Sequence, residues 1–122
     1  MSEADHQTAF FEWLEFFPKL RPFVFAIPNG GYRHPREAVR LKAQGVTRGI
    51  PDVFCSIPNH EFHGLYLEFK FGKNKLTNEQ AQMFERFKRM GYACEAVYDW
   101  EVAREILIKY LGRQHFDQPN PT

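Results

Sequence analysis

Three residues in the middle of the chain have the types and spacing of a metal-assisted hydrolytic site: Asp52, Glu68 and Lys70. Glu68 and Lys70 are two positions apart in the run 65–71, so in a strand they share one face, about 7 Å apart. Asp52 begins another apolar run, 52–57. If the two strands are neighbours, Asp52 and Glu68 lie side by side and can hold one divalent cation, with Lys70 beside it.

The run 65–71 alternates strictly between two kinds of side chain. Leu65, Leu67, Phe69 and Phe71 are apolar, whereas the residues between them are Tyr, Glu and Lys. Successive side chains of a strand point to opposite faces of the sheet. We therefore expect one face of this strand to pack on a hydrophobic core and the other face to carry the candidate site.

Four short motifs surround these residues in a specific order. They are Ile-Pro-Asn-Gly-Gly at 27–31, Gly-Val-x-x-Gly-Ile-Pro-Asp at 45–52, Glu-x-Lys at 68–70 and Leu-Thr-x-x-Gln at 76–80. An Asp followed by Glu-x-Lys is weak evidence alone, but the pattern resembles the PD-(D/E)xK nucleases. Together the motifs resemble a stand-alone VRR-NUC domain, a branch of that superfamily, over nearly the whole chain.

This resemblance implies a restriction-endonuclease-like α/β fold, in which a mixed central sheet is flanked by helices. It also implies phosphodiester hydrolysis with Mg²⁺ or Mn²⁺ as the cofactor. Such hard cations prefer oxygen ligands, so we expect the carboxylates of Asp52 and Glu68 and the backbone carbonyl of Phe69 to bind the metal. Lys70 either orients and deprotonates the attacking water or stabilises the developing charge, and these two roles need opposite protonation states.

The first helix, predicted from the N-cap Ser2 to about Phe17, contains two candidate acids. The superfamily's first helix contributes a Glu to the site. Glu3 continues the helix face of Phe10, whereas Glu12 lies about 200° around the helix from Phe10. We therefore assign Glu3 to the site, as a ligand directly or through water. The alternative is that Glu3 is a first-turn acid that complements the helix dipole.

Gln80 has two competing interpretations. In Thr77-Asn78-Glu79-Gln80 it completes a capping box, in which its side chain returns to the Thr77 backbone. The resemblance instead places a Gln here that faces the active site, so Gln80 is also a candidate catalytic residue.

Basic residues gather before the Asp52 strand, although the net charge of the chain is only +1. The segment contains Arg33, Arg36, Arg40, Lys42 and Arg48 against one acid, Glu37. A run of this kind is usually a solvated helix face, but its position beside the candidate site favours contact with phosphates. The further candidates for binding DNA are Asn29, in the turn before this segment, and Lys73 and Lys75, after Lys70.

The order of elements predicted from periodicity and turn signals is α-β-α-β-β-α-β-α. The strands are expected at 23–27, 52–57, 65–71 and 93–97. Pro35 begins the second helix and Gly45 closes it, the third runs from the Thr77 cap to Gly91, and the last follows the cap Asp99, with an apolar stripe of Val102, Ile106 and Tyr110.

The length of 122 residues predicts one domain, over 1–112, followed by a polar, Pro-rich and flexible C-terminal tail over 113–122. The chain has no apolar run long enough to span a membrane and no signal-peptide pattern. Its two Cys residues are too few for a disulfide framework. These features predict a cytoplasmic protein with reduced thiols.

Stand-alone members of the family that this chain resembles are dimeric enzymes that resolve DNA junctions. We therefore expect a homodimer acting on branched DNA, above all four-way (Holliday) junctions, in repair or recombination. The alternatives are a less structure-selective nuclease, a non-catalytic DNA-binding module, and an enzyme of another class in which Glu68 and Lys70 form only a salt bridge. The non-catalytic DNA-binding module is disfavoured because burying two acids beside a Lys without a metal is costly.

Overall fold

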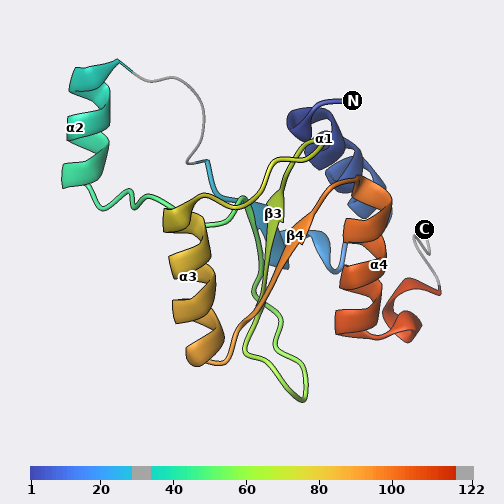
Figure 1. The fold of residues 1–122 in the computed structure, drawn as a ribbon. Coiled ribbons are helices and arrows are strands. Elements are labelled where there is room, and N and C mark those ends of the chain that lie inside the picture. The colour runs from blue at the N-terminus through green and yellow to red at the C-terminus, as the bar shows by residue number, and fades with distance from the viewer. Residues whose placement is uncertain (29–33, 118–122) are drawn as a thin grey trace.

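The computed structural model describes residues 1–28 and 34–117, and its elements follow the predicted order (Figure 1). They are α1 (Glu3–Leu14), β1 (Val24–Ala26), α2 (Pro35–Ala43), β2 (Val53–Cys55), β3 (Leu65–Phe69), α3 (Asn78–Arg89), β4 (Ala93–Val97) and α4 (Trp100–Leu111). Two short 3-10 helices, Arg21–Phe23 and Arg113–Phe116, precede β1 and follow α4.

The four strands form one sheet in the order β1-β2-β3-β4. The first two pairs are antiparallel and β3 pairs with β4 in parallel, which confirms the predicted mixed sheet. Helices α1 and α4 cover one face of this sheet and α3 covers the other, whereas α2 stands apart from the body on the α3 side (Figure 1). Within the described residues, no helix has the length and apolar composition needed to cross a membrane.

The two faces of the sheet differ as the alternation predicts. Leu65, Leu67 and Phe69 of β3 are each about 1% exposed and join the core beneath α1 and α4. Tyr66 and Glu68 point to the opposite face, where α3 lies. The regular strand ends at Phe69 rather than Phe71. Phe71 is 55% exposed, so it does not belong to the core face as expected.

Helix α1 is anchored to this core by Phe10, which is fully buried with its ring centroid 6.0 Å from that of Phe69. The Ser2 cap is confirmed, in a capping box with Asp5. The helix ends at Leu14 rather than Phe17, because Pro18 has no backbone N–H to donate to the Leu14 carbonyl in a continuing α-helix.

Helix α4 begins after the predicted cap Asp99, whose side chain accepts from the backbone N–H of Val102. Its predicted apolar stripe is wrong in detail, since Val102 is 47% exposed and the fully buried residues are Ala103 and Leu107. Ala103 and Leu107 belong to the core cluster, a choice that periodicity alone does not distinguish.

The prediction of a loose tail over 113–122 is corrected for its first part, 113–116, while residues 118–122 of that tail lie outside the described residues. Residues 113–116 form a 3-10 helix, and Phe116 packs on the core: its ring stacks on Trp13, with centroids 5.6 Å apart, and meets Phe17 edge to face, with centroids 5.0 Å apart. One aromatic residue in a polar segment thus suffices to hold the chain against the body.

Candidate active site

Asp52 and Glu68 lie next to each other at the end of the β2–β3 pair, where β2 begins and β3 ends. Val53 lies opposite Leu67 in the antiparallel register, and one further step along both strands places Asp52 opposite Glu68. Side chains opposite each other in such a pair share one face of the sheet. The structure therefore brings together the two carboxylates that the sequence predicts.

Asp52 also holds the end of β3. Its Oδ2 accepts a hydrogen bond of 2.9 Å from the backbone N–H of Phe69, in the place of a ladder bond. In an extended chain the N–H and C=O of one residue point to the same neighbouring strand. The Phe69 carbonyl therefore points to the side of Asp52, as a metal-binding role requires.

Glu68 is held in position by one hydrogen bond and one ion pair and is only 4% exposed. Its Oε2 accepts a hydrogen bond of 3.1 Å from Gln80 Nε2 and lies 3.6 Å from Lys70 Nζ, as an ion pair. Its other oxygen, Oε1, is buried and has no hydrogen-bond partner. An unpartnered buried carboxylate oxygen is costly, so this atom is a natural position for a cation.

The electrostatics of the pair agree with such a role. Burial, and then the charge of Asp52, raise the pKa of Glu68 from an ordinary 4.5 to about 8. Burial likewise raises the pKa of Asp52, despite the hydrogen bond from Phe69. Each carboxylate is thus destabilised in its charged form, which is the condition that a bound divalent cation relieves.

The donor set fits a hard cation, although it is not a closed cage. Among the described residues, no three His, Cys, Asp or Glu side chains form a group that could hold a metal ion. Asp52, the Oε1 atom of Glu68 and the Phe69 carbonyl are all oxygen donors, which Mg²⁺ and Mn²⁺ prefer. Mg²⁺ commonly keeps several waters and takes only one or two protein carboxylates, so two suffice here.

Lys70 lies next to the pair and is 8% exposed. Although β3 ends at Phe69, the Lys70 backbone N–H donates to the Val97 carbonyl at 2.8 Å, so the residue continues the pairing with β4. This bond keeps the Lys70 side chain on the face of Glu68. The structure thus brings Asp52, Glu68 and Lys70 together, as their spacing predicts.

The Gln80 side chain makes the capping contact and also reaches Glu68. Its Oε1 accepts from the Thr77 N–H at 2.9 Å and completes the predicted capping box, while its Nε2 donates to Glu68. The amide has an acceptor and a donor end, so one side chain can cap α3 and orient Glu68. The helix terminus is thereby tied to the candidate site.

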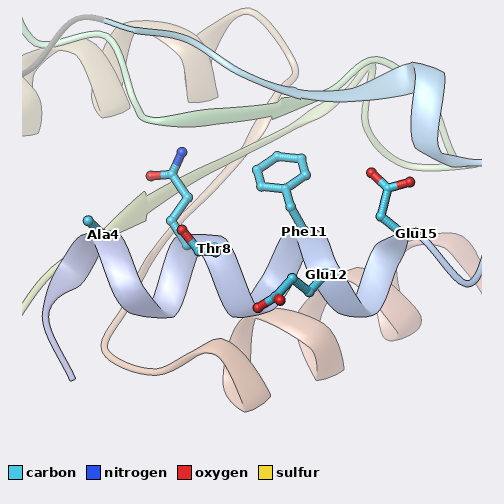
Figure 2. Close-up of a pocket in the computed structure, with 6 residues that line it drawn as sticks. Ala4, Thr8, Phe11, Glu12 and Glu15 are labelled. Atoms are coloured by element: carbon cyan, nitrogen blue, oxygen red, sulfur yellow. The ribbon is translucent and has the colours of Figure 1, made fainter.

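Glu3 lies at the start of α1, partly buried, and its negative charge contributes to the raised pKa of Asp52. This repulsion places Glu3 within electrostatic reach of the pair, but not in a group of three ligands. Glu12, the rejected rival, is exposed and lies along α1 with Ala4, Thr8, Phe11 and Glu15, around a shallow cavity of about 420 Å³ lined by α1 alone (Figure 2).

Four of the basic residues predicted to bind DNA are exposed, on α2 and in the loop after β3. Arg36 and Arg40 are exposed on α2, which buries none of its residues, and Lys73 and Lys75 are exposed in the loop between β3 and α3. A groove of about 800 Å³ separates α2 from α3 and is lined by Lys42 and Arg48 as well as apolar residues.

Two other residues predicted to bind DNA, Asn29 and Arg33, lie outside the described residues. Arg48 is exposed in the link that follows α2, with its guanidinium 3.9 Å from the Glu79 carboxylate. A surface pair of this length contributes little, so Arg48 remains available to phosphate.

Gly49 is a site-supporting residue that sequence reasoning missed. It has φ +83°, and a Cβ there would lie 2.7 Å from the Glu79 carbonyl oxygen in the first turn of α3. Only glycine allows the link after α2 to lie this close to the helix end that carries Gln80. Its position three residues before Asp52 was the available signal.

Comparisons with known proteins agree with this fold. The model of the VRR-NUC domain family matches residues 2–100. A solved structure described as "VRR_NUC domain protein" superposes with a TM-score of 0.76 at 22% identity, over 91% of this chain and 88% of that chain. At that identity the likeness shows the fold alone. No curated protein matches.

Proposed function

The chain belongs to the VRR-NUC domain family, which implies a nuclease, and from this premise we propose that it is a DNA endonuclease that uses Mg²⁺ or Mn²⁺. One observation carries the proposal: Asp52 and Glu68 are adjacent beside a buried lysine, and Glu68 Oε1 is buried without a partner. A purely structural carboxylate would gain nothing from this arrangement.

In this proposal Asp52, Glu68 and the Phe69 carbonyl hold the cation, and Glu3 adds a contact through water. A divalent cation bound there supplies positive charge at the scissile phosphate and acidifies the attacking water. Gln80 keeps Oε2 of Glu68 occupied, which leaves Oε1 directed to the cation. The residues of the chain therefore act mainly by positioning and by charge.

Lys70 acts by its position beside the cation site. Its Nζ lies 3.6 Å from Oε2 of Glu68. Held at this place, its ammonium would stabilise the negative charge that develops on the phosphate during cleavage. The alternative role is that of a general base toward the attacking water.

The substrate that we propose is a four-way DNA junction, cut by a homodimer. One chain contributes one site and cuts one strand, whereas a junction has two-fold symmetry and needs two matched cuts. A C2 dimer supplies these through one self-complementary interface. The exposed arginines of α2 suit the phosphates of a duplex arm that approaches the site.

Cleavage of a labelled four-way junction, a plasmid and a linear duplex, with Mg²⁺, with Mn²⁺ and with EDTA, tests this function. We expect symmetric nicks in the junction only with a metal, and none from Asp52→Asn, which keeps an acceptor for the Phe69 N–H. Binding without cleavage under all conditions would show a DNA-binding module instead. Light scattering should give twice the 14.4 kDa chain mass.

A further inference from the structure

A row of aromatic side chains crosses the sheet on the face that carries Asp52 and Glu68. In the register of the sheet, Phe25 of β1 lies opposite Phe54 of β2, which in turn lies opposite Tyr66 of β3. The ring centroids of Phe25 and Phe54 are 5.8 Å apart in a T-shaped arrangement, and those of Phe54 and Tyr66 are 4.5 Å apart with the planes tilted by 34°. Three neighbouring strands thus present an aromatic surface of rings in contact, in which Phe25 and Phe54 offer faces at different angles.

This surface is rigid at one end and open at the other. Tyr66 stacks on Phe87 of α3, with centroids 4.3 Å apart and planes 20° apart. The Phe54 ring lies over Gly64, where a Cβ would come within 2.8 Å of it. Phe25, at the outer end, is 42% exposed. The row is therefore a preformed platform whose open end faces solvent.

The platform adjoins the candidate active site. Phe54 and Tyr66 are each two residues from Asp52 and Glu68 on the same strands, a distance of about 7 Å along the sheet. None of the rings carries a charge, so the platform suits a nucleobase rather than a phosphate. Aromatic side chains beside a backbone-binding groove are the usual means of holding unpaired bases.

We propose that Phe25 and Phe54 form a stacking platform for one unpaired nucleobase of the DNA strand that is cut at Asp52 and Glu68. This inference rests on the proposed function and names the feature that the enzyme selects. A base in a continuous duplex is already stacked on its neighbours and is not available. A base at a branch point, bulge or flap is available, so the platform favours interrupted duplexes.

A second copy of the chain is the competing occupant, because exposed aromatic residues are also enriched at protein interfaces. A protein partner seated on Phe25 and Phe54 would cover the same face by which DNA reaches Asp52 and Glu68. The continuity of the platform with the candidate site therefore favours the nucleobase.

The test compares two labelled duplexes by fluorescence anisotropy in EDTA, where metal-dependent cleavage cannot occur. One duplex contains a single unpaired base, and the other has an abasic residue at the same position. We expect the wild-type protein to bind the first roughly tenfold more tightly. Phe25→Leu, which keeps an apolar side chain but no ring, should lose this preference, and Phe25→Trp should retain it.

Phe54→Leu is a second variant with the same expected loss, and Phe16→Ala is the control. Phe16 is 61% exposed and lies just after α1, a helix that packs on the opposite face of the sheet. Its removal should therefore not change the preference. Thermal unfolding of each variant establishes that it is folded. Equal affinity of the wild type for both duplexes, or an undiminished preference in Phe25→Leu, would overturn the platform.

A Phe25→Leu protein whose mass by light scattering falls by half would assign the row to contact between copies and would also overturn the proposal. A failure of the platform can be distinguished from a failure of the proposed nuclease function. A protein that prefers the unpaired base but cleaves no DNA with Mg²⁺ or Mn²⁺ refutes the nuclease alone. A protein that cleaves but shows no preference refutes the platform alone.

Discussion

The two faces of the central sheet consist of alternate residues of the same strands, yet they have opposite character. On the α1 and α4 face, Val53, Leu67 and Phe69 are at most 1% exposed and belong to the hydrophobic core cluster. On the α3 face, Glu68 and Lys70 are also buried, but they are ionisable groups with one carboxylate oxygen left unpaired. Burial stabilises the first face and destabilises the second.

This difference separates stability from function by a single residue step. Leu67 and Glu68 are adjacent in sequence and point to opposite faces, so a shift of the strand register by one residue would exchange the core and the site. The fully apolar face fixes the register, and the fixed register then holds Asp52 and Glu68 opposite each other. The favourable packing of the core face thereby offsets the unfavourable burial of ionisable groups on the charged face.

The largest effect is expected from substitutions on the charged face. Asp52→Asn and Glu68→Gln each preserve side-chain shape and hydrogen bonding but remove a charge that holds the cation. We expect cleavage to fall by on the order of a thousandfold or more, with loss of Mn²⁺ binding in isothermal titration calorimetry. Both proteins should remain folded. Undiminished Mn²⁺ binding by both variants would exclude this metal site.

The core face should respond in the opposite manner. Leu67→Ala leaves a cavity opposite Val53 in the core cluster and should lower the free energy of unfolding by about 2–5 kcal/mol. Urea unfolding followed by circular dichroism measures this loss. Glu68→Gln, one residue away, serves as the control and should lose far less stability. A similar loss in both variants would mean that the two faces are not energetically distinct.

Much of this division could be predicted from the sequence. The alternation of β3 fixed which side chains share a face, and the spacing of Asp52 from Glu68 was compatible with pairing of adjacent strands. The caps Ser2, Thr77 and Asp99 are local signals that depend on a few neighbouring residues, and all three are confirmed.

Features that depend on contacts between distant segments could not be predicted in the same way. The dual role of Gln80 requires the N-terminus of α3 to lie over β3, and the aromatic row requires the register of three strands. The packing of Phe116 on Trp13 joins the two ends of the chain. Periodicity describes one element at a time, so it gives no information on any of these contacts.

The pH dependence of stability sharpens the comparison further. Burial and Asp52 raise the pKa of Glu68 from 4.5 to about 8 in the folded protein, so folding favours the protonated acid. This contribution is fully present below about pH 4.5 and is lost as the pH rises toward about 8. The metal-free protein should lose up to about 1.4 kcal/mol per pH unit across this range.

Thermal unfolding in EDTA between about pH 5 and pH 8 measures this effect. The melting temperature of the wild type should fall with rising pH, and that of Glu68→Gln, which mimics the protonated acid, should fall less. Added Mn²⁺ should restore the stability of the wild type at the upper end. Parallel curves for the two proteins would mean that the raised pKa is not a property of the folded state.

A smaller effect is expected from the first helix, which belongs to the core face but reaches the site with its N-terminus. Glu3→Gln removes a charge near Asp52 and should lower cleavage by roughly tenfold. Glu12→Gln removes an exposed charge elsewhere on α1 and should leave the rate unchanged. Single-turnover rates with Mg²⁺ compare the two variants. The reverse ranking would show that the wrong acid has been assigned to the site.

The smallest expected effect concerns the contribution of α2 to DNA binding. Helix α2 lies on the α3 side of the sheet, and α4, on the opposite side, serves for comparison. Arg36 and Arg40 are exposed on α2 and form no ion pair with any described residue, whereas Lys109 is exposed on α4. If α2 contacts DNA, each neutralised arginine removes one phosphate contact. The slope of log affinity against log salt should then decrease by about 0.9 for Arg36→Ala and for Arg40→Ala.

Lys109→Ala is the matched control and should leave the slope unchanged, because α4 covers the face turned away from the site (Figure 1). Fluorescence anisotropy over a range of salt concentrations, with two duplexes of unrelated sequence, measures the slope. Both duplexes should be affected equally, since phosphate contacts carry no sequence information. If the Lys109 variant changes the slope and the α2 variants do not, DNA binds on the side of the sheet that α1 and α4 cover. The assignment of DNA binding to the α3 side is then wrong.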